Sequence, residues 1–272
     1  MTLSLGHIAY INCAPFFHYL PKCGFAGRIV SGVPSQLNRL LAEGVIDVSP
    51  SSSFEYARNW RDYLLLPELS ISSCGQVKSV LLFSARPIEQ LEGAEIALTG
   101  DSATSINLLQ VILREFYGLR NYRCQVPAGS VEAVIDKGGS ALLIGDRALR
   151  AAQNSRAKFV YDLGELWLQH TGLPFVFALW ILRRQAAADK NELVRQLQRQ
   201  LNCSRDMAFG SLQQLAAETQ ERSWMGEAGL VDYWNCMSYE LGSAHLEGLK
   251  IYFQLCVRHK LLEEMPELAF FA

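Results

Sequence analysis

Two uninterrupted apolar runs most constrain what this chain can fold into. Residues 80–83 (VLLF) and residues 175–182 (FVFALWIL) are each long enough for a strand that is covered on both faces. A stretch with the alternating pattern of an α/β unit separates them. The simplest architecture that accommodates both strands is a pair of lobes joined by a two-strand hinge. Because a cleft between lobes is a favoured place for a small ligand, we expect the ligand site there.

The same pattern predicts the domain boundaries. Lobe 1 comprises residues 1–84 and 183–272, lobe 2 comprises residues 85–182, and the ligand cleft lies between them. Leu and Met recur at helical spacing from residue 189 onward, which predicts amphipathic helices without strands. The predicted fold class is therefore α/β, two-lobed, with C-terminal helices. A length of 272 residues fits about two domains.

Composition and charge exclude several classes of partner. The net charge of −2 gives no basic footprint, which argues against nucleic acid. The first residues show no secretory signal and no apolar run reaches the length of a membrane span, so we expect a cytoplasmic protein that does not contact a membrane. The seven cysteines are scattered without CxxC spacing. This pattern favours free thiols in a reducing compartment over disulfides or zinc.

The chain carries none of the common catalytic motifs. GxSxG, the P-loop, GxGxxG, HExxH and metal-ligand spacings are all missing from the sequence, so we expect no metal and no cofactor. The ends of the predicted strands carry small polar residues instead, namely Asn12, Ser51, Ser52, Ser53, Ser73, Gly75, Ser79, Ser102, Thr104 and Ser105. Hydroxyl and amide donors without positive charge suit a small, oxygen-rich anion.

Two of these groups precede predicted helices. Residues 51–53 follow a predicted strand at 45–49, and residues 100–105 form a loop before a helix at 106–117. A helix N-terminus with hydroxyl groups favours anion binding, although serines there are more often simple caps. For the second group, in which four of five residues are small and polar, we favour binding over capping.

Three candidate residues have two interpretations each. Asn12 either caps the next helix or contacts the ligand, and Asp146 either caps a helix at 147–153 or reaches the cleft, with capping favoured. His170 is the candidate general base, but exposure at a helix end accounts for it equally well. Thr171, directly after His170, is included among the candidate substrate-binding residues.

The amino-acid sequences of these segments resemble those of a known family. The strings HIAYINCAPFF, GVPSQLNRLLAEGVIDVSPSSSFEYAR, LLPELSISSCGQVKSVLLFS, LTGDSATSINLL, LLIGDRAL and DLGELWLQHTGLPFVFALW are similar to those of the chorismate dehydratases of the futalosine route to menaquinone. The likeness extends from about residue 6 to residue 182. That family belongs to a larger group with the type II periplasmic-binding-protein fold.

The resemblance implies a hydro-lyase that removes water from chorismate to give 3-[(1-carboxyvinyl)oxy]benzoate. In the mechanism we expect, Asn12 and Ser79 hydrogen-bond the reacting region, and the hydroxyl groups of each lobe bind the substrate carboxylates. A carboxylate of the substrate takes the proton, and the rival mechanism uses His170 as the base. Two alternatives are the 1,4-dihydroxy-6-naphthoate synthase of the same pathway and a non-catalytic cytosolic solute-binding or sensor protein. The oligomeric state is left open.

Overall fold

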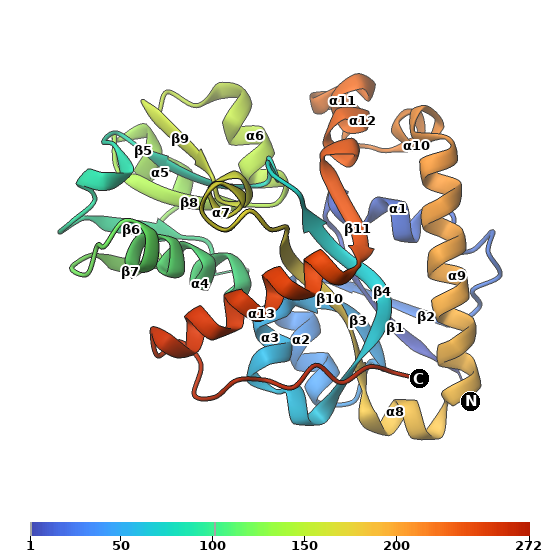
Figure 1. Ribbon diagram of the computed structural model, residues 1–272. Helices are drawn as coiled ribbons and strands as arrows, with labels where there is room; N and C mark the ends of the chain where they lie inside the picture. Colours follow the sequence, from blue (N-terminus) through green and yellow to red (C-terminus); the bar gives the residue numbers. More distant parts are fainter. Residues whose placement is uncertain (1, 101) are drawn as a thin grey trace. The chain divides into compact units, whose positions relative to one another are not determined.

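The computed structural model describes residues 2–100 and 102–272 and contains two β-sheets (Figure 1). Asp101, part of the predicted loop at 100–105, lies outside the described residues. The six-stranded sheet has the order β11-β4-β10-β3-β1-β2, formed by Met237–Leu241, Tyr63–Ser73, Phe175–Arg183, Val48–Ser52, Ser4–Ile8 and Arg28–Gly32. The five-stranded sheet has the order β7-β6-β8-β5-β9, formed by Arg123–Gln125, Glu95–Leu98, Ser140–Ile144, Val80–Ser84 and Phe159–Asp162.

The chain divides into two compact units. Unit 1 contains the chain up to Ile71 together with Ala178–Leu241 and Pro266–Ala272, and unit 2 contains Ser72–Phe177 and Gly242–Met265. The strands β4 and β10, which carry the polypeptide from one unit into the other, are neighbours in the six-stranded sheet. The last long helix, α13 (Ser243–Arg258), therefore belongs to unit 2. The sequence pattern instead predicted that residues 183–272 all belong to lobe 1.

Besides the strands of the six-stranded sheet, unit 1 contains α-helices and short 3-10 turns. They are the 3-10 turn η1 (Ile11–Cys13), α1 (Ala14–Phe17), α2 (Pro34–Ala42), α3 (Ser53–Arg58), the 3-10 turn η2 (Trp60–Asp62), α8 (Arg184–Asp189), α9 (Asn191–Gly210), α10 (Leu212–Glu218), α11 (Arg222–Met225) and α12 (Glu227–Cys236). In α2, Pro34 stands in the first turn and the buried Leu37 and Leu41 share one face. Proline is preorganised for that position, and the spacing of the two leucines explains which face the helix buries.

Unit 2 alternates strands with helices, as the sequence predicts. Its helices are the 3-10 turn η3 (Ile88–Gln90), α4 (Ala103–Val111), the π-helical turn η4 (Ile112–Phe116), α5 (Val131–Asp136), α6 (Asp146–Asn154), α7 (Leu163–Thr171) and α13 (Ser243–Arg258). The strand β5 lies between β8 and β9 and every residue of it is buried. Leu81, Phe83 and Leu143 form part of a continuous apolar core with α5 and α6. This burial confirms that residues 80–83 form a strand covered on both faces.

Several predicted elements are wrong in their bounds or type. The strand predicted at 45–49 is β3 at Val48–Ser52, so Ser51 and Ser52 belong to the strand and not to a loop. The C-terminal region, predicted as helix only, contributes the edge strand β11. This edge strand is specified by its pairing with β4, which is distant in sequence. Because the residues on either side of β11 have helical spacing, the local pattern gives no sign of a strand. In the described part of the chain, no helix is both long and apolar enough to cross a bilayer.

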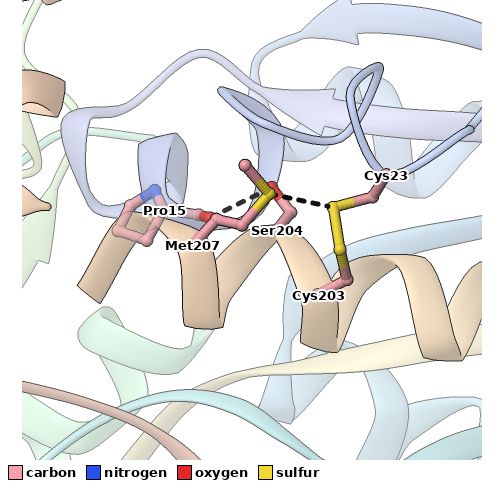
Figure 2. The surroundings of a disulfide bond; sticks show 5 residues. All are labelled: Pro15, Cys23, Cys203, Ser204 and Met207. Carbon is pink, nitrogen blue, oxygen red and sulfur yellow. Dashed lines mark hydrogen bonds between the residues drawn. A yellow bond between two sulfur atoms is a disulfide. The ribbon is translucent and has the colours of Figure 1, made fainter. Parts of the chain in front are cut away.

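The prediction that all cysteines are free thiols is wrong for one pair. Cys23, in the loop after α1, forms a disulfide with Cys203 of α9, with 6.1 Å between their Cα atoms (Figure 2). The buried Ser204 hydroxyl donates to the Pro15 carbonyl 3.3 Å away, beside the disulfide. The packing of α1 against α9 brings these cysteines together across 180 residues, and the sequence spacing gives no sign of it. Among the described residues, Cys13, Cys74, Cys124, Cys236 and Cys256 form no disulfide.

Candidate functional site

In unit 1, Asn12 and Ser51 lie at the same edge of the six-stranded sheet. The parallel strands β1 and β3 are neighbours, paired at Leu5 and Val48, and Asn12 follows the end of β1 while Ser51 lies near the end of β3. Their side-chain oxygens, Asn12 Oδ1 and Ser51 Oγ, are both buried and have no hydrogen-bond partner among the described residues. Buried polar atoms are almost always paired, so two unpaired oxygens at one sheet edge point to a ligand.

The turn that carries Asn12 is fixed by a residue that sequence reasoning missed. The indole Nε1 of Trp234, a fully buried residue of α12, donates to the backbone carbonyl of Ile11 at 2.9 Å. This bond connects η1 to a helix more than 200 residues further along the chain, and it orients the residue next to Ile11. A buried tryptophan in an amphipathic helix gives no sequence signal of that role.

Ser52 has a structural role at the start of the short helix α3, of which Ser53 is the first residue. Ser52 is its N-cap, and the Ser52 hydroxyl accepts a hydrogen bond from the Glu55 amide at 3.1 Å. Glu55 places a buried carboxylate in the first turn, 2.6 Å from the Arg58 guanidinium. A carboxylate there already occupies the electropositive end of the helix. The N-terminus of α3 is therefore not a good anion site. The Ser51 hydroxyl is the group in this segment that remains available to a ligand.

In unit 2, the loop between β4 and β5 is organised by the carboxylate of Asp162. Its Oδ2 accepts from the amides of Val77 and Lys78 at 3.0 and 2.7 Å, and its Oδ1 accepts from the amide of Gly164 at 2.9 Å. Burial raises the pKa of the Asp162 carboxyl, and the backbone hydrogen bonds oppose that shift. Asp162 thus positions the segment that carries Ser73, Gly75 and Ser79, although the sequence analysis assigned it no role.

The loop packs tightly against the beginning of α7. A Cβ at Gly164 would lie 2.5 Å from the Gly75 carbonyl oxygen and 2.6 Å from the Ser73 hydroxyl, so only glycine fits there. Gly75 itself adopts φ +131, a conformation that favours glycine. The Ser73 hydroxyl donates to the Gly75 carbonyl at 2.9 Å. Cys74, exposed in the same loop, has its Sγ 4.0 Å from Nε2 of the buried His245.

Ser79, Asp146 and Ser102 come to one edge of the five-stranded sheet. The amide of Gly145 donates to the Ser79 carbonyl at 2.7 Å, and the parallel strands β6 and β8 end at this same edge. Asp146 is the first residue of α6, where Gly145 is the N-cap, so the predicted capping role for Asp146 is wrong. The Ser79 hydroxyl donates to the Val77 carbonyl at 3.2 Å.

The N-terminus of α4 lies at this edge as well. Ser102 is its N-cap and accepts from the Ser105 amide at 3.4 Å, and no acidic residue lies in the first turn. Thr104 and Ser105 are buried within that turn, not in the loop that was predicted. Thr99, the residue directly after β6, also has a buried hydroxyl without a hydrogen-bond partner among the described residues. Thr99 satisfies the same strand-end rule that selected Asn12, and the sequence analysis missed it.

His170 and Thr171 lie apart from this group. The exposed His170 ring stacks on Phe116 with 4.4 Å between ring centroids. Phe116 follows Ser102 by 14 residues, which corresponds to about 20 Å along a helix at about 1.5 Å per residue. This distance separates Phe116, and the His170 ring stacked on it, from the N-terminus of α4. The Thr171 hydroxyl donates to the Trp167 carbonyl at 2.7 Å, which closes the last turn of α7. Both residues are accounted for by local packing.

A cavity of about 340 Å³ lies beside the turn that carries Asn12, within unit 1. Its lining includes His7, Tyr10, Ile11 and Phe17. The His7 ring lies 4.1 Å from the Phe17 ring between centroids, and burial lowers the pKa of His7. A neutral imidazole packed on an aromatic ring indicates a structural role for His7.

Curated relatives match most of the chain. The chain is 35% identical over 264 residues to the chorismate dehydratase of Thermus thermophilus, which covers 91% of this chain and 93% of that protein. It is 30% identical over 198 residues to the chorismate dehydratase of Campylobacter jejuni, covering 71% and 70% respectively.

Solved structures support the fold, and a family model supports the family. The periplasmic aliphatic sulphonate binding protein of Escherichia coli superposes with a TM-score of 0.68 at 16% identity, covering 98% of this chain and 90% of that one. The fold is therefore of the periplasmic-binding-protein type, as predicted. A family described as menaquinone biosynthesis matches residues 3–258. With nearly its whole length matched, the chain belongs to this menaquinone biosynthesis family.

Proposed function

We propose that this protein is a chorismate dehydratase, a hydro-lyase of menaquinone biosynthesis. Two curated relatives, at 35% and 30% identity, have that name, and the matched family is described by that pathway. The residues that carried the sequence resemblance lie within the matched region. The proposal includes a cytoplasmic location, which fractionation of cells followed by immunoblotting would check.

One structural observation carries the assignment of the substrate-binding residues. Asn12 Oδ1 and Ser51 Oγ are buried without a partner at one sheet edge. Chorismate offers carboxylates, which accept hydrogen bonds, and a ring hydroxyl, which both donates and accepts. The Asn12 amide supplies an acceptor and two donors, and the Ser51 hydroxyl supplies a donor. These groups match the substrate without a positively charged side chain.

In unit 2, the substrate contacts that we propose involve the N-terminus of α4 and the loop held by Asp162. The Ser102 and Ser105 hydroxyls and the helix dipole favour a carboxylate. Ser79 lies at the same sheet edge and, like Asn12, hydrogen-bonds the reacting region. Within unit 2, we propose that Ser73, Gly75, Thr104 and Asp146 line the site.

The reaction removes a proton from a ring carbon and the ring hydroxyl, which leave together as one water molecule while the ring becomes aromatic. The protein contributes orientation and hydrogen bonds to the departing oxygen. A carboxylate of the bound substrate accepts the proton and passes it to the departing oxygen, so that water leaves and the carboxylate is regenerated. Aromatisation supplies the driving force, so the protein does not require a strong base of its own.

Replacing His170 with Asn tests the rival mechanism. We expect turnover within about threefold of the wild type, because the exposed ring stacks on Phe116 away from the strand ends, whereas loss of a general base costs about 100-fold or more. The measurement is kcat at saturating chorismate across pH. A loss of about 100-fold with retained folding would instead assign the base to His170.

The function itself is tested with the purified protein. Incubation with chorismate followed by mass spectrometry should yield a product lighter by one water, with the ultraviolet spectrum of a substituted benzoate. A sample treated with a chelator and dialysed should give the same product. Chorismate that binds and returns unchanged would contradict the proposal and favour a binding protein.

A further inference from the structure

A second polar cavity lies within unit 1, at the edge of the sheet opposite Asn12 and Ser51. Its volume is about 410 Å³, within the range of about 300 to 1,000 Å³ that is typical of ligand pockets. The lining is formed by the end of β10, the start of β4 and the turn η2, and includes Arg61, Asp62, Tyr63, Arg183 and Arg184. None of these residues belongs to the proposed dehydratase site.

The register of the sheet separates the two sites. Ser51 pairs with Leu179 in the antiparallel ladder between β3 and β10. Arg183 follows Leu179 by four positions, which corresponds to about 13 Å of strand at about 3.3 Å per residue. A ligand in this cavity is therefore distinct from one bound at Asn12 and Ser51.

The charge of the lining is strongly positive. The lining contains three arginines and one aspartate, a formal excess of two positive charges in a protein whose net charge is −2, and the Arg61 guanidinium lies over the Trp60 ring, 4.5 Å from its centroid. The neighbouring carboxylates of Glu55 and Glu43 are paired with Arg58 and Arg39. Among the described residues, no carboxylate lies within salt-bridge distance of Arg183 or Arg184.

Local packing fixes the donors of this cavity in place. The Arg184 Nε donates to the Arg61 carbonyl at 2.7 Å. This bond does not use the two terminal nitrogens of the Arg184 guanidinium. The Arg183 guanidinium lies against Gly44, where a Cβ would approach its Cζ to 2.9 Å. Burial, together with the nearby carboxylates of Glu55 and Asp62, raises the pKa of Tyr63 to about 12, and its hydroxyl, protonated at neutral pH like that of any tyrosine, can donate. Guanidinium groups held in fixed positions favour bidentate binding of a compact oxyanion.

We propose that this cavity, through the guanidinium groups of Arg183 and Arg184 and the hydroxyl of Tyr63, binds the dianionic phosphate group of a small molecule. A phosphate group carries about −1.5 to −2 charges near neutral pH, which matches the excess positive charge of the lining. The cavity extends beyond the space that phosphate alone fills, so a phosphate monoester fits better than the free ion. This proposal does not depend on the dehydratase assignment.

Arginine modification locates the site in the unaltered protein. Phenylglyoxal should modify Arg183 and Arg184 several-fold more slowly in the presence of inorganic phosphate or glycerol 3-phosphate, as measured by peptide mass spectrometry. Arg199, an exposed arginine of α9 with a side chain 67% exposed, is the internal control and should react at an unchanged rate. Equal protection of Arg199, or no protection of Arg183, would overturn the proposal.

Calorimetric titration with the same two probes tests the chemistry. Arg183→Gln should raise the Kd for glycerol 3-phosphate by about tenfold or more, Arg183→Lys should give an intermediate value, and the matched control Arg199→Gln should stay within about twofold. Ser51→Ala should leave the Kd unchanged, because Ser51 lies at the other edge. An equal affinity for malonate, or equal weakening by Arg199→Gln, would overturn the assignment to a phosphate group. Thermal melting of each variant verifies folding.

Discussion

Replacement of Asn12 by Ala should lower kcat for chorismate dehydration by about 100- to 1,000-fold, which is the usual effect of removing one preorganised hydrogen-bonding group from a reacting centre. The physical reason is that Asn12 Oδ1 is buried without a partner, on a turn held by the Trp234 indole. In the proposed function, the substrate supplies the missing hydrogen-bond partner of Asn12 Oδ1. Steady-state kinetics with the product detected by mass spectrometry gives the result.

The chain offers a matched control for this experiment. Asn38 in α2 also has a buried Oδ1 without a partner among the described residues, but it lies outside the proposed site. Asn38→Ala should leave kcat within about twofold of the wild type and should shift the unfolding free energy by a similar small amount to Asn12→Ala. Equal kinetic losses in both variants would mean that Asn12 acts through stability alone.

The second large effect is expected at Asp162. Asp162→Ala removes the acceptor for the amides of Val77, Lys78 and Gly164, and buried amides left without partners cost about 1 to 3 kcal/mol each where water cannot replace the bond. We expect the free energy of unfolding to fall by about 3 kcal/mol in urea titration. We also expect kcat to fall because the loop no longer holds Ser79 in position.

A conservative variant separates positioning from general destabilisation. Asp162→Asn keeps one carbonyl oxygen as acceptor and should restore a large part of both the stability and kcat. Asp206→Ala, at an exposed aspartate whose side chain is 67% exposed, serves as the surface control and should change the unfolding free energy by no more than about 0.5 kcal/mol. A kcat of Asp162→Asn as low as that of Asp162→Ala, at recovered stability, would assign the carboxylate a direct role in the reaction.

Local patterns predicted the elements whose burial is uniform. The apolar run at 80–83 became β5, and the run at 175–182 became β10, because strands buried on both faces need apolar side chains at every position. The polar residues at strand ends were also predictable, since the carboxyl ends of parallel strands meet at one edge. That rule selected Asn12 and Ser51, and it would also have selected Thr99 had it been applied to the end of β6.

Long-range partners could not be predicted in the same way. The indole of Trp234 acts on Ile11, Cys203 bonds Cys23, and the Asp162 carboxylate organises a loop more than 80 residues earlier. None of these pairings has a spacing or a motif, because each depends on how elements pack after they form. The edge strand β11 was missed for the same reason.

The sequence by itself determined the alternation of strands and helices, the buried strands and the hydroxyl-rich strand ends, because these depend on side-chain periodicity and on local backbone preference. The tertiary structure decided which candidates are available for a ligand. It used Ser52 as a helix cap, packed His170 on Phe116 and left Asn12 Oδ1 and Ser51 Oγ unpaired. It also placed Arg61 and the adjacent pair Arg183 and Arg184, which come from two separate segments, around one cavity. Hydrogen-bond satisfaction is a property of the packed neighbourhood, and only the folded chain defines that neighbourhood.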